Sequence, residues 1–319
     1  MKSIIWNMTR LCPWTCKFCC VGAECISGLK KVNTEKDKDF KHNNELSFNE
    51  KINVIDQLKK GDFRIDFSGG DLLIDPLNLD VVLYASEKLG KENVGISVSG
   101  AFIDEEIVSK LEGKINDVEM TLDYVPFKPY KSRPIGYHEY TANAVSLLRE
   151  KNISVGVQTV LTNDNISKEQ IKELYDWLIK HNVNGWSLLR YFSSGRGEKF
   201  TNIMPSHIQY EKAVDYIKNL TKGGNVDVHF QYLLPNHSGY TLNCRAVKHS
   251  IGILPDGTVT ACFWGLNEDM KAIDPKFVLG FVPDMNIYNI LQNDKSQYWI
   301  NSCNECEIFT YNKLEKNFG

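Results

Sequence analysis

The segment Cys12-Pro13-Trp14-Thr15-Cys16-Lys17-Phe18-Cys19 places three cysteines close together near the start of the chain. Three thiolates at this spacing can hold one iron–sulfur cube while its fourth iron keeps an open coordination position. An iron with an open position can bind a second molecule and reduce it, whereas a cluster with four protein ligands only transfers electrons. The segment therefore predicts a catalytic metal cluster with Cys12, Cys16 and Cys19 as its ligands.

The alternatives for these cysteines are a zinc knuckle, a disulfide pair or thiols that only pack. Zinc sites usually combine two pairs of closely spaced ligands, and the nearest further thiols, Cys20 and Cys25, do not reproduce that spacing. Cys20 directly follows a predicted ligand, so we expect it to pack beside the cluster. Donation of a hydrogen atom or service as a labile extra ligand are the alternatives for Cys20.

The complete Cys-x3-Cys-x-aromatic-Cys string, with Phe18 before its third cysteine, resembles the hallmark of the radical S-adenosylmethionine (radical SAM) superfamily. In that family the string lies on the loop after the first strand of a partial barrel. The resemblance implies a [4Fe–4S] cluster that binds S-adenosylmethionine (SAM) through its open iron. It also implies that Phe18 belongs to the cofactor site.

The composition is that of an ordinary globular protein, with 319 residues, of which 42% are hydrophobic and 24% charged. The net charge of -3 gives no basic footprint for a nucleic acid. No apolar run approaches the roughly 18 residues of a membrane span, and the first residues do not read as a signal peptide. We therefore expect a cytoplasmic protein without nucleic-acid or membrane partners. Its nine cysteines then favour metal or redox chemistry over disulfides.

The first two thirds of the chain alternate short β-rich runs with amphipathic helical stretches, which is typical of βα units around a parallel sheet. Six or seven units predict an α/β fold, a partial (β/α)6 TIM-like barrel over residues 1–232. The expected strands are residues 3–9, 63–68, 94–99, 117–122, 153–161, 185–189 and 226–231. In such barrels the reactive groups lie on loops after the strands. The polar stretch 30–45 is expected to be a solvated insertion.

Ser68-Gly69-Gly70-Asp71 follows the second expected strand and resembles the Gly-Gly-Glu motif of the radical SAM family. In the family this motif meets the amino group of the methionine part of SAM, and paired glycines let the backbone approach a ligand closely. Asp71 replaces the more frequent glutamate, so its side chain is a less secure match than the backbone. We expect all four residues at the cofactor site.

Further residues that follow strands complete the expected cofactor site. Ser97 and Ser99 fall where related enzymes carry a Thr-Asn-Gly-like string that reaches SAM, and Asp123 follows the next strand. Arg190 resembles a late-strand arginine of many relatives and could pair with a carboxylate of SAM or of the substrate. For the nearby Arg196, an ion pair at the protein surface is as good an interpretation as a contact with SAM or with the substrate.

The pattern changes from residue 233, where two short β-runs flank the hairpin signal Pro255-Asp256-Gly257. Cysteines 244 and 262, followed by Cys303-x2-Cys306, resemble the twitch extension, the shortened form of the SPASM domain. The resemblance implies a small α+β domain over residues 233–319. It also implies one auxiliary [4Fe–4S] cluster bound by Cys244, Cys262, Cys303 and Cys306. A zinc ribbon is the alternative, because two cysteine pairs also suit zinc, but the wide spacing of the first pair favours the twitch extension.

The resemblance implies an enzyme that cleaves SAM reductively to a 5′-deoxyadenosyl radical, which abstracts hydrogen from the substrate. A fully ligated auxiliary cluster suits the removal of an electron afterwards, hence net oxidation. Relatives with such extensions often crosslink or otherwise modify ribosomally synthesised peptides, which we take as the first expectation. The alternatives are a dehydrogenase or epimerase acting on an aminocyclitol, sugar or other small molecule, and a noncatalytic zinc or iron–sulfur electron-transfer protein.

Two further partners follow from this interpretation. Reduction of the cluster requires a one-electron donor such as flavodoxin or ferredoxin. Because the cysteine string begins at Cys12, little chain precedes it for a leader-binding domain, so a separate protein could recognise the peptide. The loop from Tyr124 to Tyr137, which contains Phe127, Tyr130 and Arg133, is expected to rim the barrel mouth. It either contacts substrate or packs on the barrel.

Overall fold

The computed structural model describes the chain except residues 129, 232–233, 235–243, 302–305 and 309–319. Its main element is a ten-stranded sheet with the order β12-β11-β10-β1-β4-β5-β6-β7-β8-β9. Neighbours from β10 to β9 are parallel, whereas β10, β11 and β12 pair antiparallel. The prediction of an α/β fold with a mainly parallel sheet is confirmed. The sheet is open, with β12 and β9 at its two ends.

The strands of the main sheet match the expected runs to within a few residues, except β12, which the sequence did not predict. They are β1 (Lys2–Asn7), β4 (Phe63–Ser68), β5 (Val94–Val98), β6 (Asp117–Thr121), β7 (Ser154–Leu161), β8 (Gly185–Arg190), β9 (Asp227–Phe230), β10 (Ser250–Ile253), β11 (Thr258–Thr260) and β12 (Val278–Phe281). A separate two-stranded parallel sheet joins β2 (Leu11–Cys12) to β3 (Glu24–Cys25), with Cys12 opposite Cys25. This small sheet, which the sequence did not predict, closes the two ends of the cysteine loop.

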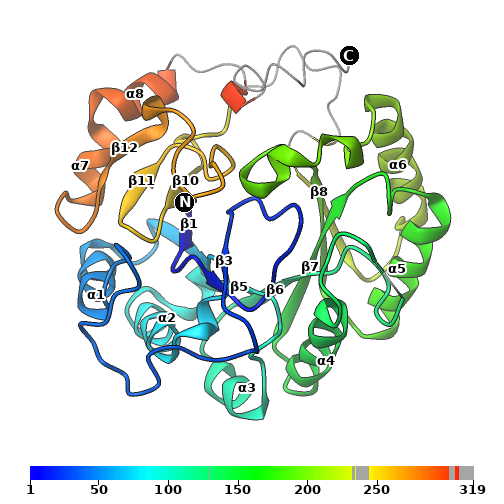
Figure 1. Ribbon diagram of the computed structural model, residues 1–319, viewed down its shortest axis with the longest axis horizontal. Coiled ribbons are helices and arrows are strands. Elements are labelled where there is room, and N and C mark those ends of the chain that lie inside the picture. The colour runs from blue at the N-terminus through cyan, green and yellow to red at the C-terminus, as the bar shows by residue number, and fades with distance from the viewer. Residues whose placement is uncertain (129, 232–233, 235–243, 302–305, 309–319) are drawn as a thin grey trace.

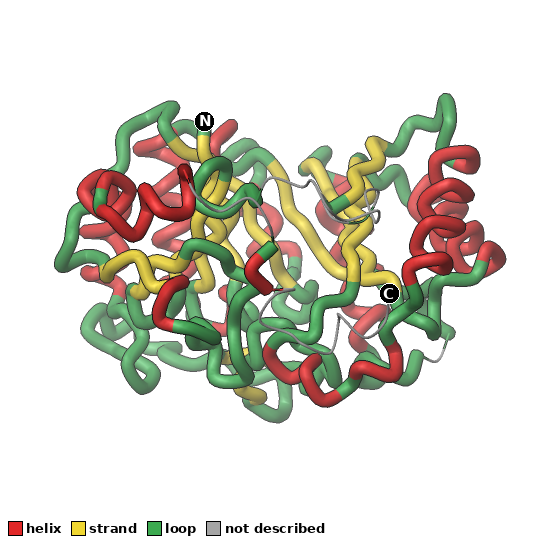
Figure 2. The backbone as a smooth tube through the Cα atoms, turned by 90° about the horizontal axis from the view of Figure 1, so that it is seen from above, coloured by secondary structure: helices red, strands yellow, loops and turns green. Residues whose placement is uncertain are grey.

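Helices cover the outer face of the sheet (Figures 1 and 2). They are α1 (Phe48–Gln57), α2 (Pro76–Leu89), α3 (Glu105–Leu111), α4 (Tyr137–Glu150), α5 (Lys168–Lys180), α6 (His207–Leu220), α7 (Ile287–Gln292) and α8 (Asp294–Asn301). A capping box begins α1, because the side chains of Ser47 and Glu50 each accept a hydrogen bond from the other's backbone N–H. Such reciprocal caps satisfy N–H groups that would otherwise lack a partner within the helix.

The strands that surround the centre alternate in burial, and this alternation creates a polar interior. In β4, Phe63, Ile65 and Phe67 are buried, whereas the intervening Arg64, Asp66 and Ser68 are partly accessible. The same period of two continues in β7. A parallel sheet covered on both faces is usually apolar throughout, so polar residues on one face predict a cavity there. The apolar set packs outward against the helices.

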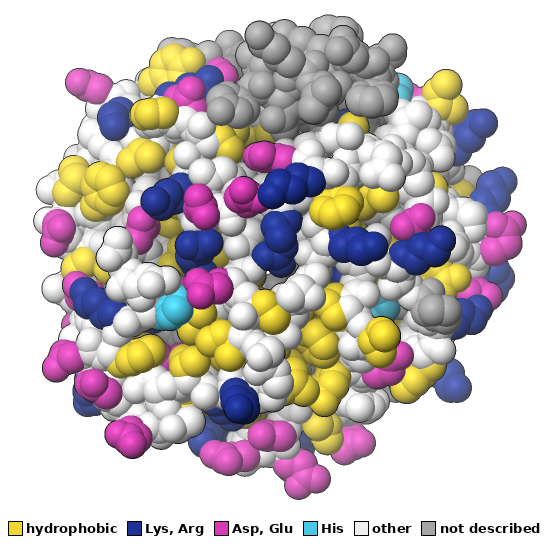
Figure 3. Space-filling model, in the orientation of Figure 1, with side chains coloured by type: hydrophobic (Ala, Val, Ile, Leu, Met, Phe, Trp, Pro, Cys, Tyr) yellow, Lys and Arg dark blue, Asp and Glu magenta, His cyan; other side chains and the backbone are white. Residues whose placement is uncertain are grey.

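The C-terminal strands extend the main sheet. Strand β10 pairs with β1 in parallel, with Ser3 opposite Ser250, and residues on both sides of position 233 share one apolar core. The division at residue 232 into two domains remains a prediction. Figure 3 shows cationic and anionic side chains interspersed on one face of the molecule. No helix in the described ranges is long and apolar enough to cross a membrane.

Candidate active site

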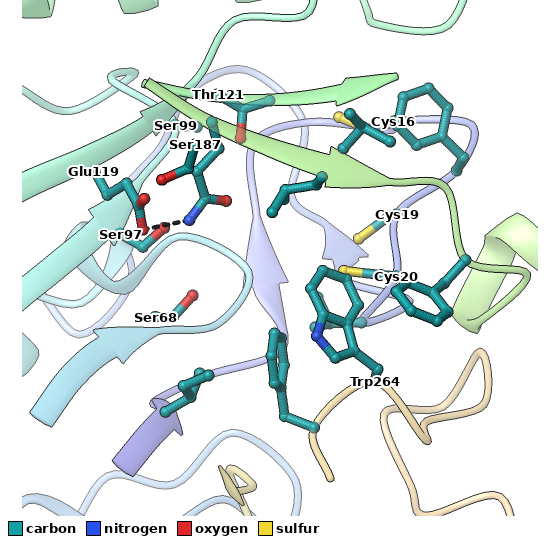
Figure 4. Close-up of a pocket in the computed structure, with 18 of the residues that line it drawn as sticks. Cys16, Cys19, Cys20, Ser68, Ser97, Ser99, Glu119, Thr121, Ser187 and Trp264 are labelled. Atoms are coloured by element: carbon teal, nitrogen blue, oxygen red, sulfur yellow. Dashed lines mark hydrogen bonds between the residues drawn. The ribbon is translucent and has the colours of Figure 1, made fainter. Parts of the chain in front are cut away.

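The three predicted cluster ligands face one central cavity. Cys12, Cys16 and Cys19 line a space of about 580 Å³ on the inner side of the sheet. Figure 4 shows Cys16 and Cys19 on one side of this cavity with Cys20 beside them. The structure thus brings together three thiols that the sequence placed on one loop.

Burial controls the protonation of these thiols. It raises the pKa values of Cys12 and Cys16, and repulsion from the neighbouring thiolates raises them further. Iron binding must therefore displace protons from these thiols. No three His, Cys, Asp or Glu side chains of the described residues are placed to share a single metal ion. A cubane cluster needs a different arrangement, because each thiolate binds a different iron of the cluster. Three thiols around one cavity fit that arrangement.

The segment after β8 clamps the cysteine loop. Arg196 donates from its backbone N–H to the carbonyl of Cys19 at 3.0 Å and from Nε to the carbonyl of Cys16 at 3.1 Å. Its Nη1 donates to the carbonyl of Ala23. Gly195 has φ +53°, and a Cβ there would lie 2.5 Å from the carbonyl oxygen of Cys19. Arg196 therefore supports the cysteine loop, and it forms no ion pair with a carboxylate of the described residues.

A hydrogen-bonded chain anchors the other side of the loop. Trp14 donates from Nε1 to the hydroxyl of Ser99 at 2.9 Å, and that hydroxyl donates to Asp71 Oδ2. Asp71 is fully buried, and its Oδ1 accepts the N–H of Leu73 at 3.1 Å. Both carboxylate oxygens are thus used inside the protein. Burial is the main cause of the raised pKa of Asp71.

The expected cofactor residues divide into two groups. Those that line the cavity are Phe18, Ser68, Gly69, Gly70, Ser97, Ser99 and Arg190. Asp71 and Asp123 lie behind the cavity wall, each bonded to a residue that does line it, Ser99 and Arg133 respectively. Their direct contact with a cofactor remains a prediction. The contact between Asp123 and Arg133 was not expected. The position of Arg133 in the loop after β6 was the only feature of the sequence that indicated a role for it.

Side chains on the inner face of β6, β7 and β8 form a polar wall of the cavity, which was not predicted from the sequence. Glu119 of β6 accepts a hydrogen bond from the amide of Gln158 on β7 (Figure 4). Burial raises the pKa of Glu119. Both residues line the cavity with Ser187 of β8. Polar residues at alternate positions of three neighbouring strands were the available signal.

The C-terminal part of the chain supplies the opposite wall. Arg245, Phe263 and Trp264 line the cavity and directly follow Cys244 and Cys262. The ring of Trp264 stacks on Phe192 at 5.2 Å between centroids. Burial raises the pKa of Cys262 to about 12, with smaller contributions from the thiols of Cys306 and Cys244. Cys244 and Cys306 therefore lie within electrostatic reach of Cys262, and the fourth expected ligand, Cys303, lies outside the described residues.

Folding stability should fall with decreasing pH because of His138. This side chain is 4% exposed, its Nε2 accepts the N–H of Asp123 at 3.4 Å, and burial lowers its pKa from 6.5 to about 4. Below pH 6.5 the unfolded chain binds a proton that the folded chain refuses, so stability is lost progressively towards pH 4. We expect a loss of about 2 kcal/mol between pH 7.5 and pH 5 from this group. Urea unfolding at both pH values measures it.

The matched variant for this measurement is His138→Gln, which does not titrate and keeps an acceptor near Nε2. Between the two pH values this variant should lose about 2 kcal/mol less stability than the wild type does. Equal pH dependence in both proteins would show that His138 protonates freely in the folded state.

The chain is similar to known proteins in both sequence and fold. The family model of the radical SAM superfamily matches residues 6–178, more than half of the chain. The Fe-coproporphyrin III synthase of Methanosarcina barkeri is 29% identical over 222 residues, which cover 69% of this chain and 51% of that protein. The AdoMet-dependent heme synthase of Nitratidesulfovibrio vulgaris is 21% identical, covering 80% of this chain and 65% of that protein. The chain thus matches about half to two thirds of these relatives' lengths.

Solved structures agree on the fold. Streptococcus suis SuiB bound to S-adenosylmethionine superposes with a TM-score of 0.68 at 15% identity, covering 94% of this chain and 67% of SuiB. The structure of anSMEcpe with bound AdoMet gives 0.62 at 16% identity, covering 96% of this chain and 86% of that chain. The matched family model spans the cysteine loop and strands β4 to β7. The chain is therefore an enzyme of the radical SAM superfamily.

Proposed function

We propose that the chain uses SAM to remove a hydrogen atom from a substrate, with net oxidation of that substrate. We also propose that it holds a second cluster, which accepts an electron from the substrate radical. One observation carries this proposal. A single cavity is lined on one side by Cys12, Cys16 and Cys19 and on the other by residues that directly follow Cys244 and Cys262. A substrate in this cavity would lie close to both cysteine sets. The bound cluster and SAM would supply a 5′-deoxyadenosyl radical for hydrogen abstraction.

The chain's own residues would bind and orient the reactants. Gly69 and Gly70 would present backbone to the methionine part of SAM, and Arg190 would face its carboxylate. The aromatic wall of Phe192 and Trp264 would exclude water from the reacting carbon.

Net oxidation also releases a proton, which needs an acceptor inside the cavity. Asp66 is paired with Arg64 at 2.8 Å, whereas Glu119 is bonded by the neutral amide of Gln158. A carboxylate whose partner is neutral keeps its basicity, and burial raises the pKa of Glu119 further. Glu119 is therefore the proposed proton acceptor.

The first proposed substrate is a ribosomally synthesised peptide that receives a crosslink or another modification. Pockets for drug-sized ligands range over about 300–1,000 Å³. A cavity of about 580 Å³ must accommodate SAM, so only a small part of a substrate, such as one side chain, fits beside it. The structural neighbour SuiB is known bound to precursor peptide SuiA, which is consistent with this choice. A flavodoxin or ferredoxin would supply electrons, and a separate protein could recognise the peptide.

Oxidation of a small molecule is the second candidate. The sequence relatives named Fe-coproporphyrin III synthase and AdoMet-dependent heme synthase favour a tetrapyrrole. Stimulation of 5′-deoxyadenosine formation separates the two candidates. A short peptide encoded beside the gene should stimulate it if the first is correct, and a tetrapyrrole should do so if the second is.

Iron analysis tests the two-cluster assignment. After anaerobic reconstitution we expect about eight irons per wild-type chain and about four in Cys262→Ser, because each cubane contains four. The variant should still form 5′-deoxyadenosine from SAM with dithionite as reductant, since Cys12, Cys16 and Cys19 are unchanged. About four irons in the wild type would remove the auxiliary cluster from the proposal. Zinc with little iron would contradict it entirely.

A further inference from the structure

Arg133 lies between the cysteine loop and a buried carboxylate. Its Nε donates to Asp123 Oδ2 at 2.6 Å, and the two side chains are 10% and 0% exposed. The other carboxylate oxygen accepts the N–H of Val160 on β7 at 2.9 Å. A carboxylate fixed to the sheet in this way orients the guanidinium, which can form hydrogen bonds only within its own plane.

The guanidinium is enclosed by aromatic rings. Its Cζ lies 4.6 Å from the ring centroid of Phe18 and 5.0 Å from that of Tyr137. Phe18 stands in the sequence between two predicted ligands, so this stacking holds the cation against the cysteine loop. Burial raises the pKa of the Cys16 thiol, and Arg133 also lies close enough for its positive charge to oppose that larger effect. Both contacts exclude water, and charge interactions are stronger where water is excluded.

We propose that Arg133, held by Asp123, is a positioning residue that sets the reduction potential of the group bound by Cys12, Cys16 and Cys19. This inference rests on the proposed function in that it requires a cluster there. Hydrogen bonds to ligand sulfurs and the net local charge set the potentials of iron–sulfur sites. A cation beside the Cys16 thiolate favours the reduced state, which carries one more negative charge. The neighbouring carboxylate acts in the opposite direction from a greater distance.

Two substitutions should therefore shift the potential in opposite directions. Arg133→Met leaves the Asp123 carboxylate uncompensated, so the potential should become more negative. Asp123→Asn leaves the Arg133 charge uncompensated, so the potential should become less negative. Arg133→Lys keeps the charge and should lie nearer to the wild type than Arg133→Met. General loosening of the loop would not produce shifts of opposite sign.

The measurement is a redox titration of the reconstituted full-length protein, followed by electron paramagnetic resonance without SAM. Each protein is compared with its Cys262→Ser counterpart, so that the first cluster is observed alone. Lys17→Met is the matched control, because it removes one positive charge from an exposed position in the same loop. Exposed charges are screened by solvent, so its potential should equal that of the wild type.

Unchanged potentials in Arg133→Met and Asp123→Asn would overturn the inference. A raised KM for SAM at an unchanged potential would show that Arg133 contacts SAM instead. If neither Arg133 variant retains iron, the direction of the shift in Asp123→Asn decides. The proposed function would fail differently, through a wild-type protein that holds no cluster or forms no 5′-deoxyadenosine.

Discussion

Replacing Cys16 with serine is expected to remove the first cluster and abolish SAM cleavage. Cys16 is buried, and the clamp from Arg196 fixes its backbone carbonyl, so no other thiol of the loop can take its place without rebuilding the loop. A serine hydroxyl ionises far less readily than a thiol and is a poor iron ligand. We expect the loss of about four irons per chain. Formation of 5′-deoxyadenosine should fall to the level of a reaction without protein.

Cys25→Ser is the matched control for this experiment. Cys25 is exposed and stands opposite Cys12 in the small sheet formed by β2 and β3, but it does not line the cavity. Its replacement should leave both the iron content and SAM cleavage unchanged. Retention of full iron and activity by Cys16→Ser, or their loss only in Cys25→Ser, would show that the ligand assignment is wrong.

The parts of the fold that depend on local pattern were predictable. The alternation in Phe63–Ser68 identifies a strand because every second side chain is apolar, and Ser47 with Glu50 identifies a helix start through a contact of only three residues. The cysteine spacing is equally local. Each of these signals lies within one element, so no knowledge of the tertiary structure was needed to read it.

The supporting contacts of the site were not predictable because they join distant parts of the chain. Arg196 reaches the loop of Cys16 across 180 positions, and nothing in its neighbourhood indicates that partner. Asp71 shows a conflict between two local signals. Its place in a glycine motif suggested a cofactor contact, whereas an aspartate before Leu72–Ile74 is also a good helix cap. The structure uses the side chain as the cap.

The C-terminal strands show the same limit. The change of pattern at residue 233 did not indicate that β10 pairs with β1, at the opposite end of the sequence. Which strand pairs with which depends on the edges that the assembled sheet leaves without a partner. The local sequence pattern identifies a strand but does not identify the strand beside it.

Gly70→Ala should have a large effect on both stability and activity. A Cβ at this position would lie 2.1 Å from the carbonyl oxygen of Leu11 and 2.8 Å from that of Arg10. Both atoms belong to backbone that cannot rotate away. Two hydrogen bonds of 2.8 Å hold the segments together at this point, from Gly70 N–H to Thr9 and from Asp71 N–H to Leu11. The methyl group must break this junction, because it occupies the space that the approach requires.

We expect Gly70→Ala to cost about 3 kcal/mol, the upper end of the usual range for overpacking. The apparent Tm should fall by roughly 6 °C or more. SAM cleavage should be lost as well, because the methyl group would push apart two segments of the site. One carries Gly69 and Gly70 on the cavity wall, and the other, Arg10 and Leu11, directly precedes Cys12. Gly185→Ala is the control, since its Cβ would meet only the carbonyl oxygen of Asp227, at 3.7 Å. If both variants were equally stable and active, Gly70 would not be needed for the close approach of the two backbone segments. Contact with the ligand would then be the remaining reason for two glycines after β4.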